Sequence, residues 1–310
     1  MIVASLLVSL ALGQSSDPYV RSRVQQGNAS SQCLFWTAST IRWQLSSVGN
    51  PKSSEAQKQN EFAAIRRSFQ SWQDVFEDCG NLRFEEGPLV DGERNKVGYD
   101  PKGPNRNLVL FRSNRCEDVV PAGVRCDADA DCGNTYDCWE DDERTIALTL
   151  TTYDEKSGII YDSDIQLNAA HFVFTTVDSP PYPICPQPIA SNPGNCVGTD
   201  VQNTMTHEIG HLIGLDHTQA VNSVMFPRAP VGETSKRIID EGSRDFVCQT
   251  YPRGLASQSC FTPTPDSGAS SAKLGGAAFG CSSTGAGTWL PAMTGFALLA
   301  WRRRRGGARP

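Results

Sequence analysis

The sequence lacks three features that would each point to a different class of protein. Basic residues form no cluster before the last few positions, and the net charge is −6. This balance argues against nucleic acid or an anionic membrane surface as the main partner. No two cysteines have the CxxC spacing, and the apolar stretch at residues 288–301 is shorter than the roughly 20 residues of a full membrane span. The 310 residues can form one large or two modest domains, and the 39% hydrophobic content is enough for a core.

Cysteines are nevertheless numerous and spread along the chain. This distribution indicates a disulfide framework formed outside the cytosol. Setting aside Cys281 as the odd residue leaves an even number of cysteines for disulfide bonds. The spacing does not determine which cysteine pairs with which. A local bridge between Cys185 and Cys196 is our guess. The eleven cysteines are Cys33, Cys79, Cys116, Cys126, Cys132, Cys138, Cys185, Cys196, Cys248, Cys260 and Cys281.

Histidine is scarce, and three of the 4 histidines lie in one short stretch. His207 and His211 are four residues apart, so on a helix they share a face and can bind one ion. Glu208 points away from that ion but can reach a water bound to it, which suits a general base. Gly214 can take positive φ and end the helix, so that His217 supplies a third nitrogen. Three ligands leave the fourth position of a tetrahedral zinc open, as in catalytic sites.

A helix with ordinary surface or core histidines is the simpler alternative for a bare HExxH pattern. The added spacings of Gly214 and His217 favour a zinc site and resemble the motif of the metzincin metalloproteases. Met225, in the stretch 222–227, stands where that family has a methionine turn beneath the metal. Thr218 is most similar to the residue that follows the third histidine in the matrixin branch.

The resemblance implies an α+β metzincin fold over residues 33–255. We expect a twisted, mostly parallel sheet with an antiparallel edge strand, a backing helix and a zinc-site helix that crosses the cleft. It implies one catalytic Zn²⁺, peptide-bond hydrolysis through a zinc-bound water with Glu208 as general base, and protein or peptide substrates. Met225 would form a floor under the histidines, and residues 226–236 would form the wall of the substrate pocket.

Hydrophobic periodicity places the other elements. Aromatic residues at spacings of three and four predict a helix around residues 62–76, with Ser54 and Gln57 as a capping box and Gly80 at its end. Thr199 with Gln202 predicts the start of the zinc-site helix, and a closing helix over 238–251 could be stapled by Cys248. Strands are predicted at residues 40–45, 82–84 and 107–111, and a hairpin at 144–153 and 159–168.

Residues 158–168 resemble the strand that precedes the zinc-site helix in bacterial matrixins. By that resemblance, the strand before it is the sheet edge, where an extended peptide substrate adds by backbone pairing. The residues concerned are Ile146, Ala147, Leu148, Thr149, Leu150 and Thr151.

Asp127, Asp129 and Asp131 alternate between cysteines and suggest a calcium loop. Cys132 and Cys138 stand where an EF-hand needs its glycine and its glutamate, so the segment does not fit an EF-hand loop. An acidic insertion held by disulfides is the favoured interpretation. A looser Ca²⁺ site stays open as an alternative. His171 follows Ala170 as in animal matrixins with a structural zinc, but the partner histidines are missing, so we expect an ordinary loop or strand residue.

The two ends of the chain have their own signals. Residues 1–13 are typical of a signal peptide, with a buried strand or helix as the alternative, and residues 14–32 form a short polar segment with no room for a folded pro-domain. Residues 256–280 have the composition of a flexible linker. The segment 281–310, with its apolar stretch and arginines, resembles a myxobacterial sorting signal processed near Gly280 and lipidated on Cys281. A plain single-span anchor is the alternative.

We therefore expect an exported zinc endopeptidase, extracellular or tethered at the cell surface. Its expected partners are sorting and processing machinery, and a membrane that its C-terminal tail contacts; nucleic acid is not expected. A non-catalytic surface binding module that retains the fold is the rival hypothesis, and the intact Glu208 argues against it. A protease confined to autoprocessing or to one partner substrate is a third.

Overall fold

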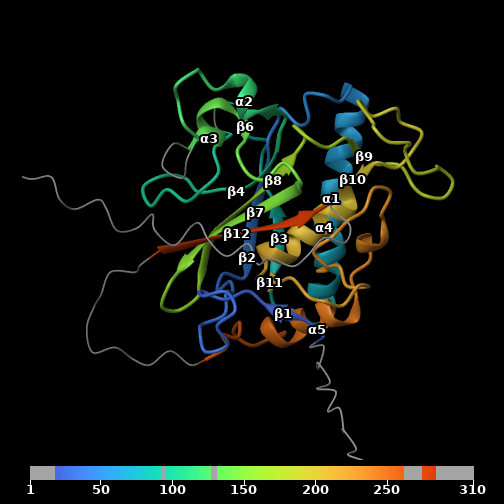
Figure 1. Cartoon of the computed structure of the whole chain (residues 1–310). Coiled ribbons are helices and arrows are strands. Elements are labelled where there is room, and N and C mark those ends of the chain that lie inside the picture. The colour runs from blue at the N-terminus through green and yellow to red at the C-terminus, as the bar shows by residue number, and fades with distance from the viewer. Residues whose placement is uncertain (1–17, 93–94, 127–130, 262–273, 284–310) are drawn as a thin grey trace, which may run out of the picture.

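The computed structural model describes residues 18–92, 95–126, 131–261 and 274–283 (Figure 1). The expected signal peptide at 1–13, Asp127, Asp129 and the tail beyond residue 283 lie outside the described residues. Within them, no helix combines the length and the apolar character needed to cross a membrane.

A six-stranded sheet forms the centre of the fold. Three of its strand pairs, β2–β3, β2–β4 and β4–β8, are parallel, whereas β7 is antiparallel to both β8 and β12. This arrangement confirms the expected mostly parallel sheet with an antiparallel strand at one side. The order is β12 (Leu274–Ser282), β7 (Thr145–Asp154), β8 (Ile160–Asn168), β4 (Asn107–Arg112), β2 (Thr40–Leu45) and β3 (Arg83–Glu86).

The backing helix α1 (Glu55–Cys79) begins and ends as its sequence predicts. Ser54 and Gln57 form a reciprocal capping box, and Gly80 follows the last turn. Its aromatic stripe is buried, with Phe69 stacked on Trp43 of β2 at a ring-centroid distance of 3.8 Å. The indole of Trp72 donates to the carbonyl of Thr206 on α4 (Val201–Leu212), so α1 fixes the helix that carries the histidines.

The strand β12 corrects the expectation of a flexible linker at the end of residues 256–280. Residues 274–280 pair with residues 148–154 of β7, and Cys260 is held to Cys33 by a disulfide. A glycine- and alanine-rich segment can pair in this way because main-chain hydrogen bonds, and not side chains, make the ladder. Figure 1 shows β12, in red, beside β7 and next to α4.

Ten cysteines form five disulfides, and Cys281 is free and buried, as the odd count predicted. The guessed bridge Cys185–Cys196 is confirmed. The expected staple on the closing helix α5 (Glu241–Thr250) is also present, because Cys248 pairs with Cys79 at the end of α1.

The insertion between β4 and β7 is knotted by the disulfides Cys116–Cys138 and Cys126–Cys132, as expected. Arg112, fully buried at the end of β4, fastens the insertion by donating to Asp137 and Asn134. The elements of the insertion are β5 (Asn114–Arg115), α2 (Cys116–Val119), α3 (Cys132–Tyr136) and β6 (Cys138–Trp139).

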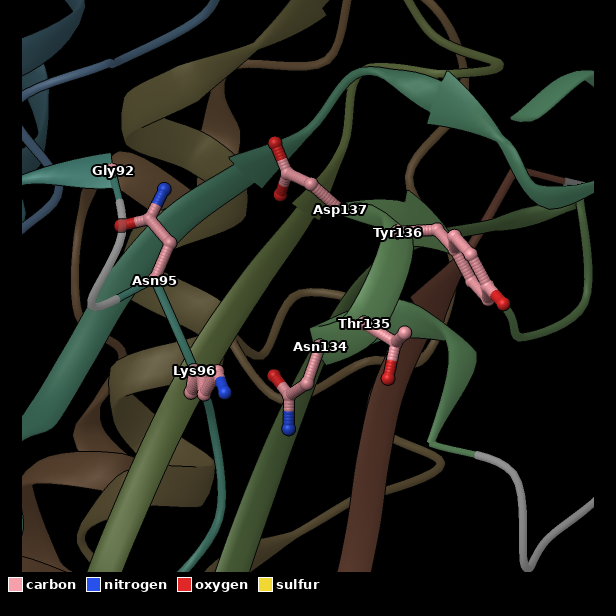
Figure 2. A pocket seen from close by; sticks show the side chains of 7 residues that line it. All are labelled: Gly92, Asn95, Lys96, Asn134, Thr135, Tyr136 and Asp137. Atoms are coloured by element: carbon pink, nitrogen blue, oxygen red, sulfur yellow. The ribbon is translucent and has the colours of Figure 1, made fainter. Parts of the chain in front are cut away.

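A polar pocket of about 530 Å³ opens against this insertion. Figure 2 shows Gly92, Asn95 and Lys96 on one side of it and residues 134–137 on the other. None of these residues belongs to the histidine cluster, to β7 or to β12, so the pocket is separate from the residues expected to act in catalysis.

Short elements complete the described part of the chain. Besides β5 and β6 of the insertion, which pair with each other, two-residue strands pair in two further small sheets, and a single turn of 3₁₀ helix lies at the end of the expected pocket wall. They are β1 (Val20–Arg21) with β11 (Leu215–Asp216), β9 (Phe174–Thr175) with β10 (Thr199–Asp200), and η2 (Ser235–Arg237).

Candidate metal centre

The helix α4 is fixed at both ends. Its N-cap is Asp200, whose carboxylate accepts from the N–H of Asn203 at 2.7 Å, so the prediction of Thr199 as the cap is wrong by one residue. At the other end, the indole of Trp36 donates to the carbonyl of Leu212, and the hydroxyl of Tyr251 donates to the carbonyl of Ile213. Carbonyls that helix geometry leaves without partners are thereby satisfied, and the last turn holds one conformation.

The structure brings His207, His211 and His217 together. Their Nε2 atoms form a triangle in which each pair is 3.2 Å apart. Zinc–nitrogen bonds of about 2.0–2.1 Å in a tetrahedral site separate two ligand atoms by roughly 3.3–3.4 Å. The triangle therefore has the size that one zinc ion requires. Within the described residues, this is the one group of three or more potential ligands.

The imidazoles are oriented by main-chain carbonyls. Nδ1 of His207 lies 2.6 Å from the carbonyl of Val224, and Nδ1 of His211 lies 2.8 Å from that of Leu215. A carbonyl can only accept, so Nδ1 of each ring carries the proton and Nε2 carries a lone pair. The two Nε2 atoms cannot hydrogen-bond to each other in this tautomer. Converging lone pairs of this kind fit a cation.

Burial keeps the three rings neutral, the form that binds a metal. It lowers the pKa of His217 to about 4, with Lys236 adding a smaller effect, and it lowers the pKa of His207 and His211 well below the ordinary value of a histidine. The neighbouring histidines add to the lowering of the pKa of His211.

Gly214 makes the turn that brings His217 back to the helix. Its φ is +100°, and a Cβ there would lie 2.6 Å from the carbonyl oxygen of Leu34. Only glycine meets both conditions without strain. The chain then enters β11, and His217 follows directly, as the spacing predicted.

Met225 packs against the helix α4 at Gly210, which lies between His207 and His211 in the sequence. It is buried against Gly210, where an added Cβ would come within 2.3 Å of its sulfur. The turn is held by Asp240, whose carboxylate accepts from the hydroxyl of Ser223 and from the N–H of Val224. Since the carbonyl of Val224 orients His207, the turn supports a ligand directly.

Glu208 follows His207 on α4 and is not part of the group of potential metal ligands. Its Oε2 accepts from the hydroxyl of Thr149 on β7 at 2.7 Å, and burial raises its pKa to about 8. Two contacts oppose this effect and lower the pKa of Glu208: the hydrogen bond from Thr149 and the nearby main-chain N–H of Cys281. The other carboxylate oxygen, Oε1, is buried and has no hydrogen-bond partner of ordinary geometry among the described residues. A bound dication would oppose the effect of burial and favour the carboxylate.

The residues expected to bind substrate are covered by the chain itself. Residues 147–151 of β7, five of the six expected to bind substrate, pair with residues 277–281 of β12. The ring of Phe279 lies on His211, and Cys281 is buried next to Glu208. The segment therefore occupies the edge of β7 where a peptide would have to bind.

His171 stays outside the metal cluster and is half-buried, as expected for a loop residue. Burial lowers its pKa, and the nearby Arg115 adds to that effect. Asp131 takes a left-handed conformation at the start of α3. The calcium loop itself falls partly outside the described residues, so Ca²⁺ binding stays a hypothesis.

The sequence model of the matrixin family matches residues 128–251. Over 56 residues the chain is 41% identical to matrix metalloproteinase-25 of Homo sapiens, a stretch covering 17% of this chain and 10% of that protein. Over 58 residues it is 38% identical to matrix metalloproteinase-25 of Mus musculus, covering 18% and 9%. The chain thus spans about a tenth of the length of these relatives. The family match confirms the α+β metzincin fold and supports a zinc metalloendopeptidase.

Sequence reasoning missed some residues that shape the site. Thr149 was expected only as part of a strand, and its contact with Glu208 depends on how α4 packs on the sheet. Phe279 and the β12 pairing gave no periodic signal, because glycine and alanine surround the single aromatic residue. Asp240 could have been found as the N-cap of α5, since aspartate before a helical pattern is a known start signal.

Proposed function

We propose that this chain is an exported zinc-dependent endopeptidase that hydrolyses peptide bonds in extended protein or peptide substrates. The observation that carries the proposal is the triangle of Nε2 atoms, 3.2 Å on each side, with the carboxylate of Glu208 beside it. A structural site would surround the ion with four protein ligands, whereas the residues that the structure describes supply three, which leaves a position for reactants.

His207, His211 and His217 would hold the zinc. When bound there, zinc supplies a Lewis acid for the peptide carbonyl and for water. The carbonyls of Val224 and Leu215 keep two of the rings in the binding tautomer, and Met225 closes the floor beneath them.

Glu208 would move the protons. Its carboxylate takes a proton from the attacking water and delivers it to the departing amine nitrogen. Thr149 holds Oε2 in place, which leaves Oε1 free to exchange protons with reactants. The main chain of β7 would align the substrate by strand pairing, as its pairing with β12 illustrates.

Export is part of the proposal. Five disulfides fit an oxidising compartment, and residues 1–13 have the pattern of a signal peptide. Surface attachment through the segment 281–310, lipidation of Cys281, and contacts with sorting machinery and the membrane are proposed on sequence grounds alone.

The test uses the full chain, because β12 covers the edge of β7. Phe279→Gly removes the ring that lies on His211 and should loosen β12. The zinc-loaded variant is expected to hydrolyse a casein-type substrate and to lose that activity on treatment with a chelator. Adding Glu208→Ala should retain one zinc per chain and abolish hydrolysis.

Two results would count against the proposal. Full hydrolysis by the zinc-loaded Glu208→Ala double variant would refute the role of Glu208. Absence of hydrolysis by a zinc-loaded Phe279→Gly chain that exposes β7 to solvent would favour the rival hypothesis of a binding module.

A further inference from the structure

The strand β12 is held on both of its sides beside the metal centre. On one side it pairs antiparallel with β7, with Phe279 opposite Thr149 and Cys281 opposite Ala147. On the other, the N–H of Ser282 donates to the carbonyl of Pro227 at 2.9 Å, and the N–H of Ala229 donates to the carbonyl of Ser282 at 3.0 Å. The extended chain therefore lies in a slot between β7 and residues 227–229, the start of the expected pocket wall.

Two contacts fix which peptide bond of β12 lies at the centre. Phe279 stacks on His211, a ligand of the triangle, with ring centroids 5.0 Å apart. Two residues later, the main-chain N–H of Cys281 faces the carboxylate of Glu208. The peptide bond between Gly280 and Cys281 lies between these contacts, with its nitrogen next to the proposed general base.

Gly280 allows this close approach. A Cβ at this position would lie 2.5 Å from the carbonyl oxygen of Ala147 and 2.7 Å from Cγ2 of Thr145. The Cys281 side chain is buried beside the wall, with Lys236, Glu208 and Glu233 near it. Its thiol does not join the histidine group within the described residues, so the segment is held by its main chain and not by ligation through sulfur.

We propose that the chain is its own substrate, and that its metal centre hydrolyses the Gly280–Cys281 bond of β12. The inference rests on the proposed endopeptidase function. It differs from a purely inhibitory strand, because the nitrogen of this bond faces Glu208, the residue that would protonate an amine leaving group.

The reaction is a simple hydrolysis. Water adds its oxygen to the carbonyl carbon of Gly280, and the bond from that carbon to the nitrogen of Cys281 breaks. Glu208 accepts a proton from the water and passes it to that nitrogen. The products are a carboxylate at Gly280 and a new amino terminus at Cys281, with no change of oxidation state.

The experiment follows the full-length chain purified in the presence of a chelator. Excess zinc is added, and the intact mass and the terminal peptides are measured over time. We expect fragments that end at Gly280 and begin at Cys281. Glu208→Ala and Glu208→Gln chains that bind one zinc should stay uncut. Two variants are used so that the test still holds if one of them fails to fold.

Casein hydrolysis by the zinc-loaded Phe279→Gly chain separates the two proposals. If that chain hydrolyses casein while the wild-type chain stays intact at 280–281, β12 is only an inhibitor and the inference is overturned. Cleavage at another bond of β12, or equal cleavage in both Glu208 variants, also overturns it. Failure of both casein hydrolysis and self-cleavage in zinc-loaded chains would refute the endopeptidase function itself.

Discussion

Phe279 covers His211, with the two ring planes only 17° from parallel. An aromatic ring from the C-terminal strand thus shields a metal ligand of the central helix. Stacking of this kind contributes about 0.5–1.5 kcal/mol beyond the area that it buries. Since the rest of β12 is mostly glycine and alanine, this ring is the main side-chain anchor of the strand in its slot.

Loss of the Phe279 ring should therefore free β7. In the Glu208→Ala background, which prevents self-cleavage, Phe279→Gly is expected to speed amide hydrogen exchange in β7 by at least tenfold. Ala278→Gly is the matched control, because it adds the same backbone freedom at an exposed neighbouring position. Equal exchange rates in the two variants would show that the ring does not anchor the strand.

Thr149 is expected to act as a positioning residue for Glu208. Thr149→Val keeps the shape but removes the hydroxyl that bonds Oε2. In the Phe279→Gly background, which is expected to free the edge of β7, we expect kcat to fall about tenfold, equivalent to about 1.4 kcal/mol, with little change in KM. Thr149→Ser should restore kcat because it restores the hydroxyl. A loss of stability in Thr149→Val without a loss of kcat would contradict the role.

Metal removal should destabilise the fold around α4. At a free zinc concentration of a thousand times Kd, binding adds about 4 kcal/mol to the free energy of unfolding. A chelator should lower Tm accordingly, and added zinc should restore it. His217→Ala is expected to lose the zinc and this Tm shift, whereas His171→Ala, outside the cluster, should retain both.

Gly214 should tolerate no side chain. In Gly214→Ala the new Cβ meets the carbonyl of Leu34, and the left-handed φ adds strain, so we expect a loss of about 2–4 kcal/mol in unfolding free energy together with weaker zinc binding. Gly254→Ala is the matched control, because Gly254 also has a positive φ, +74°, but a Cβ added there would meet no atom within 4 Å. It should lose only about 1 kcal/mol and bind zinc normally. Urea unfolding and zinc titration distinguish the two.

Glu61 should make stability depend on pH. Burial raises its pKa to about 7, although Ser53 and Asn50 donate to its Oε1. The folded state then binds the proton more tightly than the unfolded state, whose carboxyl has its ordinary pKa near 4.5. This contribution is present below about pH 4.5 and is lost as pH rises towards 7, by at most about 3 kcal/mol.

Glu61→Gln removes the titration and should remove this part of the pH dependence. The free energy of unfolding is measured by urea denaturation with the disulfides intact. The difference between the variant and the wild-type chain is expected to shift in favour of the variant between pH 5 and pH 8. An unchanged difference at the two pH values would show that Glu61 does not titrate in this range.

Local patterns predicted much of the site. His207, Glu208 and His211 lie on one short helix, and Gly214 determines where His217 returns, so spacing alone carried their geometry. The capping box at Ser54 and the unpaired Cys281 were likewise readable, because each depends on neighbours in sequence or on a simple count.

Long-range pairings could not be read in the same way. The pairing of β12 with β7 joins segments more than 100 residues apart, and the residues of β12 lack the alternation that marks a strand. Their composition therefore resembled a linker. The contact of Thr149 with Glu208 depends on the packing of a helix against a sheet, which periodicity does not specify.

The disulfide between Cys33 and Cys260 changes how β12 competes for the metal centre. The main chain already joins β12 to the domain, and the disulfide shortens that link by fixing Cys260 to Cys33, so occupation of the slot is governed by a high effective concentration and not by the concentration of the protein. Short connections commonly give effective concentrations in the millimolar range. A substrate from outside would have to match that value. After cleavage, everything up to Gly280 would stay attached, and dilution alone would not relieve this competition.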